Sequence, residues 1–156
     1  MIKNAELLEH GFVLVDFPIE LIVRDFVEQK NWLALDQYFL KISKPDGILR
    51  NFLAEYLDFE TLEHIIAIRS APDDEDGIWH DDGSRFLGFS LSLNLDHTNI
   101  LGGELRFKKK ESAQMEVFHP LAYGKIILFL SGIFGFEHMV SEVTKDQRIV
   151  IAGWCS

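Results

Sequence analysis

The strongest constraint on the fold of this chain is a strict alternation of large apolar and small or polar residues from position 87 to position 95, within the stretch 86–95. Leucine or phenylalanine occupies every second position, and glycine, two serines and an asparagine stand between them. Side chains on a β-strand point alternately to opposite faces, so the pattern predicts a strand with one apolar and one polar face. We expect the polar face to line a pocket, with exposure to solvent as the alternative. The apolar face should pack beneath helices and consists of Leu87, Phe89, Leu91, Leu93 and Leu95.

Seven further stretches after residue 59 have the composition of strands, with glycine and aspartate between them. Eight short strands with such turns are typical of two packed sheets, and a jelly roll protects its sheet edges in this way. The seven stretches are residues 64–69, 78–82, 104–108, 115–118, 125–130, 137–143 and 147–155.

The first third of the chain reads as helical after one short strand at residues 11–17. Apolar residues recur at helical spacing from Pro18, where proline at a helix start does no harm, and further helices are expected at residues 32–42 and 48–57. The fold class is therefore mainly β with N-terminal helices (α+β). We expect a single domain over residues 1–156, with a helical layer at about 18–57 and a jelly-roll core at about 62–155.

Charge and cysteine content narrow the function classes. The formal net charge of -10 argues against a nucleic-acid partner and against an anionic membrane surface, because both require a basic face. The single cysteine, Cys155, has no partner within the chain, and no secretory signal or long apolar run is visible. We expect a cytoplasmic protein. The acidic run at residues 73–76 is expected to be a solvated loop, with a lip that recruits a basic peptide as the alternative.

The candidate metal ligands of this chain are one histidine with two aspartates after it and a second histidine far along the chain. If residues 78–82 form a strand, His80 and Asp82 share one face and Asp81 points to the other. His138, on another apolar strand, is the natural third ligand. Two histidines and one carboxylate on one face of a metal suit Fe(II) used for oxygen chemistry. Asp81 would replace Asp82 as the ligand only if the motif lay in a loop.

Arg148 follows His138 by ten residues and offers a charged fork for a carboxylate. We expect residues 137–143 and 147–154 to form a hairpin that turns at residues 144–146. This would put Arg148 beside Glu142, roughly 13 Å of strand from His138. A five-carbon diacid bound to the metal would bridge that gap.

From Asp76 to its C-terminus the chain resembles the catalytic core of the 2-oxoglutarate and Fe(II)-dependent dioxygenases, in the prolyl hydroxylase-like branch. The matching pieces follow the order of that family over about half the chain. They are His80-Asp81-Asp82, Arg85, Leu91-Ser92-Leu93-Asn94, Gly102-Gly103-Glu104-Leu105, His119-Pro120, Gly124-Lys125, His138-Met139-Val140, Arg148 and Trp154.

The resemblance implies a double-stranded β-helix and a hydroxylase. It implies Fe(II) held by His80, Asp82 and His138, with 2-oxoglutarate as cosubstrate, O2 as oxidant and ascorbate as a candidate reductant; succinate and CO2 would be the co-products. Arg148 would bind the distal carboxylate of 2-oxoglutarate. Ser92 stands where the family commonly has a tyrosine that meets the same carboxylate. By strand parity Val140 and Trp154 would wall the pocket.

Three functions remain open from the sequence. The leading one is hydroxylation of a protein or peptide side chain, with proline suggested by the branch. The second is the same chemistry on a small metabolite. The third is a metal-binding jelly roll without oxygenase activity. No pattern in the sequence indicates the substrate or the oligomeric state.

Overall fold

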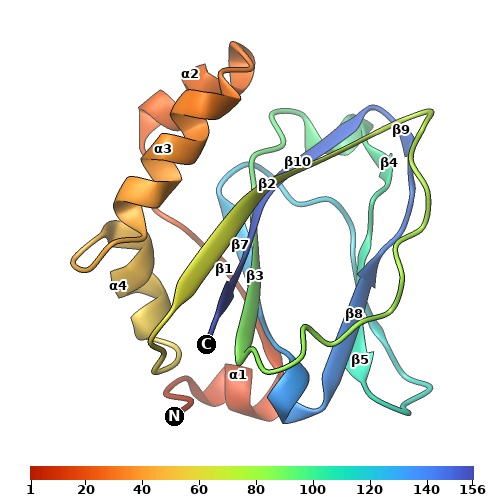
Figure 1. The fold of residues 1–156 in the computed structure, drawn as a ribbon. Coiled ribbons are helices and arrows are strands. Elements are labelled where there is room, and N and C mark those ends of the chain that lie inside the picture. The colour runs from red at the N-terminus through yellow and green to blue at the C-terminus, as the bar shows by residue number, and fades with distance from the viewer.

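The computed structural model describes all residues of the chain, 1–156. Most of the protein consists of β-strands (Figure 1). The strands are β1 (Phe12–Asp16), β2 (Leu62–Ser70), β3 (Leu87–Ser92), β4 (Leu101–Gly102), β5 (Leu105–Lys109), β6 (Glu116–Phe118), β7 (Lys125–Leu130), β8 (Phe136–Val140), β9 (Val143–Lys145) and β10 (Gln147–Cys155). The helices are α1 (Ala5–His10), α2 (Leu21–Glu28), α3 (Trp32–Ile42) and α4 (Ile48–Ala54).

Two antiparallel sheets face one another and make a jelly roll. The larger sheet has the strand order β1-β7-β3-β10-β2, and the smaller has the order β6-β5-β8. A short pair, β4-β9, lies at one end. Figure 1 shows α2, α3 and α4 against the outer face of the larger sheet, so the inner face is left to the space between the sheets. The predicted fold class, mainly β with an N-terminal helical layer, is confirmed.

The helical layer matches the apolar spacing that predicted it. Helix α3 is capped by Asn31, the residue before it, whose side-chain oxygen accepts a hydrogen bond from the backbone N–H of Ala34 at 3.2 Å. The short helix α1 was not expected from the sequence. It is capped at its start by Asn4, whose side chain accepts from the N–H of Leu7, and at its end by Gly11, which has φ +82°. None of the helices is both long enough and apolar enough to cross a membrane.

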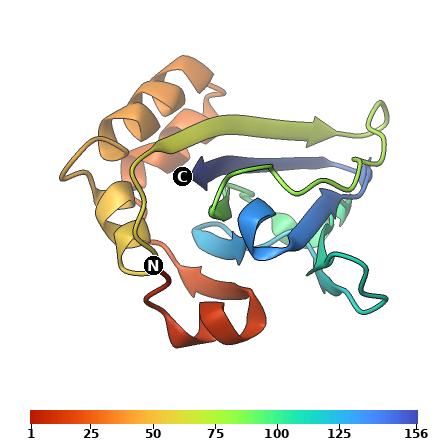
Figure 2. The same ribbon diagram turned by 60° about the horizontal axis from the view of Figure 1, so that its bottom comes forward.

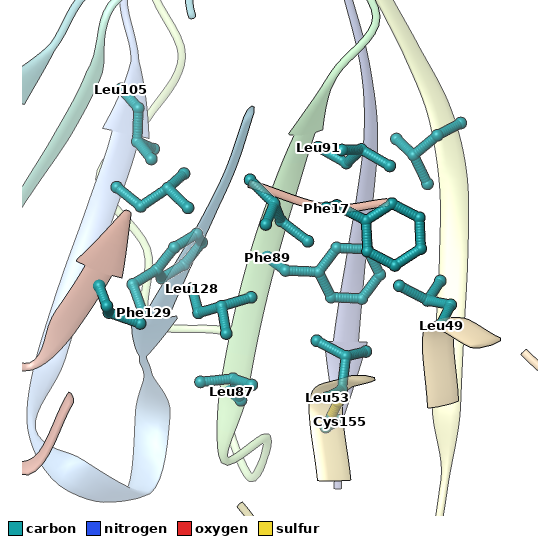
Figure 3. Close-up of a cluster of buried hydrophobic side chains, with 14 of the residues drawn as sticks. Phe17, Leu49, Leu53, Leu87, Phe89, Leu91, Leu105, Leu128, Phe129 and Cys155 are labelled. Atoms are coloured by element: carbon teal, nitrogen blue, oxygen red, sulfur yellow. The ribbon is translucent and has the colours of Figure 1, made fainter. Parts of the chain in front are cut away.

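The alternating strand β3 divides the interior in the predicted way. Leu87, Phe89 and Leu91 are buried in one cluster with Leu49 and Leu53 of α4 (Figure 3). The small polar residues of β3 face the space between the sheets. Leu95 departs from the prediction, because β3 has ended before it and its side chain is 39% exposed.

Two predictions of local structure are wrong. Residues 78–82 do not form a strand, since only His80 makes a β-bridge. The hairpin of 137–143 with 147–154 does not exist either, because β8 pairs with β5 in the smaller sheet while β10 lies between β2 and β3 in the larger one. Apolar alternation identifies a strand but not its neighbour. Arg148 consequently lies opposite Arg69 of β2 rather than beside Glu142.

Candidate metal centre and adjoining cavity

His80, Asp82 and His138 converge between the sheets. Their potential ligand atoms all lie within 4.8 Å of one another. Nε2 of His80 is 3.4 Å from one carboxylate oxygen of Asp82, and Nε2 of His138 is 3.6 Å from the other. The structure therefore brings together the three residues that the sequence predicted as ligands.

The backbone brings them together by a route that the sequence did not predict. His80 and His138 exchange two backbone hydrogen bonds, of 3.0 and 2.9 Å, which put their side chains next to each other. Asp82 reaches them because its backbone has φ +59° at the start of a turn, and not because it continues a strand. A left-handed φ is uncommon for a residue other than glycine and often marks a functional turn.

Asp81, the alternative ligand, points out of the centre. Its carboxylate pairs with Lys110 and accepts a hydrogen bond from the N–H of Gly83 at 2.9 Å. The bond from Lys110, followed by that from Gly83, holds the pKa of Asp81 below its usual value. The carboxylate of Asp81 thus stabilises the turn, and Asp82 is the aspartate that faces the two histidines.

The polar atoms of the centre fit a divalent cation. Nδ1 of His80 lies 2.9 Å from the carbonyl oxygen of Ile78, and since a carbonyl only accepts, Nδ1 carries the proton and Nε2 keeps a free lone pair. Oδ2 of Asp82 is buried without a hydrogen-bond partner. Burial lowers the pKa of His138 to about 4, so its imidazole is neutral at pH 7. A buried carboxylate oxygen without a hydrogen-bond partner, facing two imidazoles, is suited to bind a cation.

Arg148 is the second notable group, because it is buried without an acidic partner. Its side chain is 6% exposed and forms no ion pair. Its one side-chain hydrogen bond is to the hydroxyl of Ser90, at 3.5 Å. Burial, with the nearby charge of Arg69, lowers the pKa of Arg148 to about 10, so it stays charged at pH 7. Such a cation attracts an anion into the space beside it.

A cavity of about 210 Å³ joins the two features. Both histidines and Arg148 line it, so the metal centre and the unpaired cation share one chamber. Val140 and Trp154 also line it, as strand parity predicted.

Ser92 lies next to this chamber, but its hydroxyl is fully engaged. It donates to the carbonyl of Leu121 at 2.6 Å and accepts from the side-chain and backbone nitrogens of Asn94. Ser90, two residues earlier, borders the chamber and touches Arg148. The sequence did not single out Ser90 as the hydroxyl next to Arg148, although Ser90 lies on the polar face of the strand that the sequence identified.

Gly103 is the second residue of the Gly102-Gly103 pair before β5, and its position next to Arg148 requires a glycine. It has φ +66°, and a Cβ there would stand 2.9 Å from Cδ of Arg148. The absence of a side chain therefore lets the chain pass close to the buried arginine.

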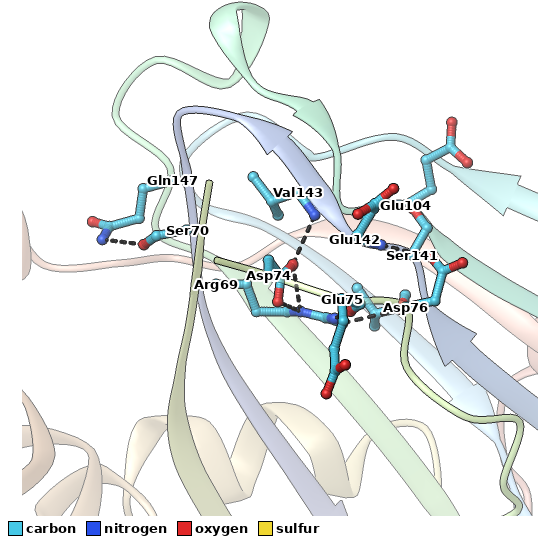
Figure 4. Close-up of polar contacts among 11 residues, drawn as sticks. Arg69, Ser70, Asp74, Glu75, Asp76, Glu104, Ser141, Glu142, Val143 and Gln147 are labelled. Carbon is cyan, nitrogen blue, oxygen red and sulfur yellow. Dashed lines mark hydrogen bonds and ion pairs between the residues drawn. The ribbon is translucent and has the colours of Figure 1, made fainter. Parts of the chain in front are cut away.

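Arg69 of β2 also borders the chamber and was not predicted. It donates to the carboxylate of Asp74 at 3.0 Å and to the carbonyl of Val140 at 3.0 Å. Asp74 in turn accepts from the N–H of Val143, and Asp76 accepts from the N–H of Glu142 (Figure 4). Three of the four acids in the run 73–76 are exposed, as expected for a solvated loop, but the run is not a free lip. Two of its carboxylates fasten loop 71–77 to the segment after β8.

Comparison with known proteins agrees with this geometry. In fold, the chain is similar to an oxidoreductase of the 2OG-Fe(II) oxygenase family from Burkholderia pseudomallei, with TM-score 0.70, 15% identity, and coverage of 97% of this chain and 88% of that one. It is similar to a prolyl-4-hydroxylase from Pseudomonas putida, with TM-score 0.62, 20% identity, and coverage of 96% and 87%. It is also similar to a Trichoplax adhaerens prolyl hydroxylase in complex with a hypoxia inducible factor peptide fragment, with TM-score 0.62, 14% identity, and coverage of 96% and 85%.

A search of curated protein sequences gave no match. The sequence model of one family does match, over residues 67–156, which is more than half of the chain and includes the whole metal centre and Arg148. Membership implies Fe(II) and 2-oxoglutarate as cofactor and cosubstrate. The chain belongs to the 2OG-Fe(II) oxygenase superfamily.

Proposed function

We propose that this oxygenase hydroxylates a C–H bond of a peptide or protein side chain, with proline as the expected target. The observation that carries the proposal is the joint presence, around one cavity, of the His-Asp-His group and of a buried arginine without an acidic partner. The likeness of the fold to prolyl hydroxylases is the reason for naming proline.

His80, Asp82 and His138 would hold Fe(II) and leave the opposite side of the ion open. The carbonyl of Ile78 fixes the ring of His80 with its free nitrogen toward the centre. The two backbone hydrogen bonds between the histidines fix their separation. These contacts hold the three ligand side chains around one point.

Arg148 and Ser90 would bind the distal carboxylate of 2-oxoglutarate. The guanidinium supplies charge and the hydroxyl supplies one further donor, which matches a carboxylate oxygen. Ser92 has an indirect role, because its hydroxyl holds Asn94, and Oδ1 of Asn94 accepts from the N–H of Ile149 at 2.7 Å. That bond fixes the strand on which Arg148 stands.

Apolar side chains would keep water away from the reacting groups. Leu105, Phe129 and Val140 line the chamber beside His138. When bound, Fe(II) and 2-oxoglutarate let O2 convert a substrate C–H into C–OH while 2-oxoglutarate becomes succinate and CO2. The residues of the chain bind, orient and enclose these groups.

An anaerobic titration tests the cosubstrate site. We expect the Fe(II)-loaded protein to show a weak visible charge-transfer band as 2-oxoglutarate is added, and we expect Arg148→Ala to shift the midpoint to much higher concentration. Arg106→Ala is the matched control, because Arg106 is paired with Glu104 on the smaller sheet and does not line the chamber. Binding of iron without any band would contradict the proposal.

A second experiment tests the class of substrate. Succinate release should rise above its background rate with proline-containing peptides and not with free proline. Stimulation by free amino acids alone would instead assign the enzyme to small metabolites.

A further inference from the structure

Strand β2 leaves one long edge of the larger sheet open. It is the last strand of the sheet, spans Leu62–Ser70, and is hydrogen-bonded only to β10. Figure 2 shows it along the margin of the molecule with no strand beyond it.

The backbone groups on that edge can be assigned by alternation. Thr61 and Ser156 exchange two hydrogen bonds, so the bonded positions of β2 are every second residue from Thr61. The N–H and C=O groups of His64, Ile66 and Ile68 therefore point outward. No backbone hydrogen bond joins these groups to the rest of the chain.

This edge lacks several of the features that usually protect one, although Glu63 and Arg69 place charged groups on its inner face. It contains no proline, no lysine and no register shift, and Ile65 and Ile68 are 49% and 37% exposed. Open edges of this kind pair readily with another extended chain.

The position and charge of the edge favour a peptide as that chain. Ala67 and Arg69 line the chamber of the metal centre, so a strand added about 4.8 Å outside β2 would lie at its mouth. The acids near the edge are Glu63, which pairs with Arg85 and is 58% exposed, and Asp36, which lies 3.0 Å from Nε2 of His64 and is 45% exposed. With a net charge of -10, two copies of the chain repel each other, whereas a basic peptide is attracted.

We propose that β2 is the docking edge for the substrate: an extended, basic peptide adds to it as an antiparallel strand and presents a proline opposite Ala67. This inference rests on the proposed hydroxylase function and adds to it that the peptide substrate binds in an extended conformation.

Strand geometry makes proline acceptable at that position. In an antiparallel pair, residues opposite each other share a face, and Ala67 belongs to the positions that bond to β10. The peptide residue opposite Ala67 therefore faces the chamber and directs its own N–H away from β2. Proline, which has no N–H, loses no bond there. A parallel strand would place a β2-bonded residue at the chamber and would disfavour proline.

The test uses the full chain loaded with Fe(II) and 2-oxoglutarate without oxygen. The probe is a fluorescein-labelled peptide, Lys-Val-Thr-Val-Pro-Val-Thr-Val-Lys, and its binding is followed by anisotropy. N-methylation of the valine after proline removes an N–H that faces β2 and should weaken binding about 10-fold. N-methylation of the next residue, threonine, alters an N–H that faces away and should change binding less than about 2-fold.

Variants of the protein test the same hydrogen bonds by changing β2 instead of the peptide. Ile68→Pro removes an outward N–H without breaking a bond to β10 and should weaken peptide binding, whereas Ile68→Thr keeps that N–H and should not. The 2-oxoglutarate band should persist in both variants, which shows that each is folded.

Absence of peptide binding, or equal effects of the two N-methylated peptides, would overturn the inference. So would a free-protein mass of about 36 kDa, twice the 18.0 kDa of one chain, with the outward amides of β2 protected from exchange, because a second copy would then occupy the edge. Loss of the band with peptide binding intact would refute the proposed function and leave the docking edge standing.

Discussion

Arg148 and Ser90 lie on the neighbouring strands β10 and β3, with the guanidinium Nη2 3.5 Å from the serine hydroxyl. Ser92 is on the same face of β3, but its hydroxyl is saturated by Leu121 and Asn94. The two serines therefore have different tasks.

Exchanging each serine for alanine should separate those tasks. Ser90→Ala should weaken 2-oxoglutarate binding by about 10- to 100-fold with little loss of stability, because a hydrogen bond to a charged group is worth about 1.5–3 kcal/mol. Ser92→Ala should instead lower the free energy of unfolding by about 1–3 kcal/mol, since the buried side-chain amide of Asn94 loses one of its two acceptors and keeps only the carbonyl of Leu121. Anaerobic titration and urea unfolding measure the two quantities. The reverse pattern would return the cosubstrate role to Ser92.

Asp82→Asn should remove metal binding without destabilising the metal-free protein. The Asp82 carboxylate is buried with an unpartnered oxygen, so a neutral amide of the same shape should cost nothing in the absence of metal. Thermal unfolding with and without Mn(II), which resists oxidation, checks this: Tm should rise with metal in the parent protein and should not rise in Asp82→Asn. Asp81→Asn is the control and should keep the metal-dependent rise. A clear loss of metal-free stability in Asp82→Asn would mean that the carboxylate has a structural role instead.

Asp74→Ala should loosen loop 71–77 and destabilise the protein by about 2–4 kcal/mol. Asp74 and Arg69 are 13% and 20% exposed, so the change leaves Arg69 partly buried without its partner and Val143 without an acceptor. Asp73→Ala, at the exposed neighbouring position, should change the free energy of unfolding by less than about 0.5 kcal/mol. Urea unfolding of both variants provides the comparison. Equal values would show that the loop is held by other contacts.

Cys155 should resist thiol reagents until the protein unfolds. Burial raises its pKa to about 12, so almost no thiolate exists in the native state near pH 8. The folded thiol retains its proton where the unfolded one has lost it, so the stability contributed by this group should fall as the pH rises from about 9 toward 12. Modification by a disulfide reagent across a urea series should follow the fraction unfolded. Rapid labelling in native buffer would contradict the burial.

The sequence by itself determined the parts of this protein that depend on local periodicity and on residue order. The alternation at residues 86–95 located β3 and its two faces, and helical spacing after Pro18 located the layer above it. The ordered set of His80, Asp82, His138 and Arg148 identified the family before any contact was known.

Tertiary structure alone decided which partners those residues meet. Alternation shows which face a side chain takes but carries no information about the neighbouring strand, so the hairpin expected for Arg148 was wrong. The saturation of Ser92 depends on a carbonyl 29 positions away, and the fastening of Asp74 depends on an N–H 69 positions away. Hydrogen bonds between such distant residues arise from the path of the folded chain, which residue spacing does not encode.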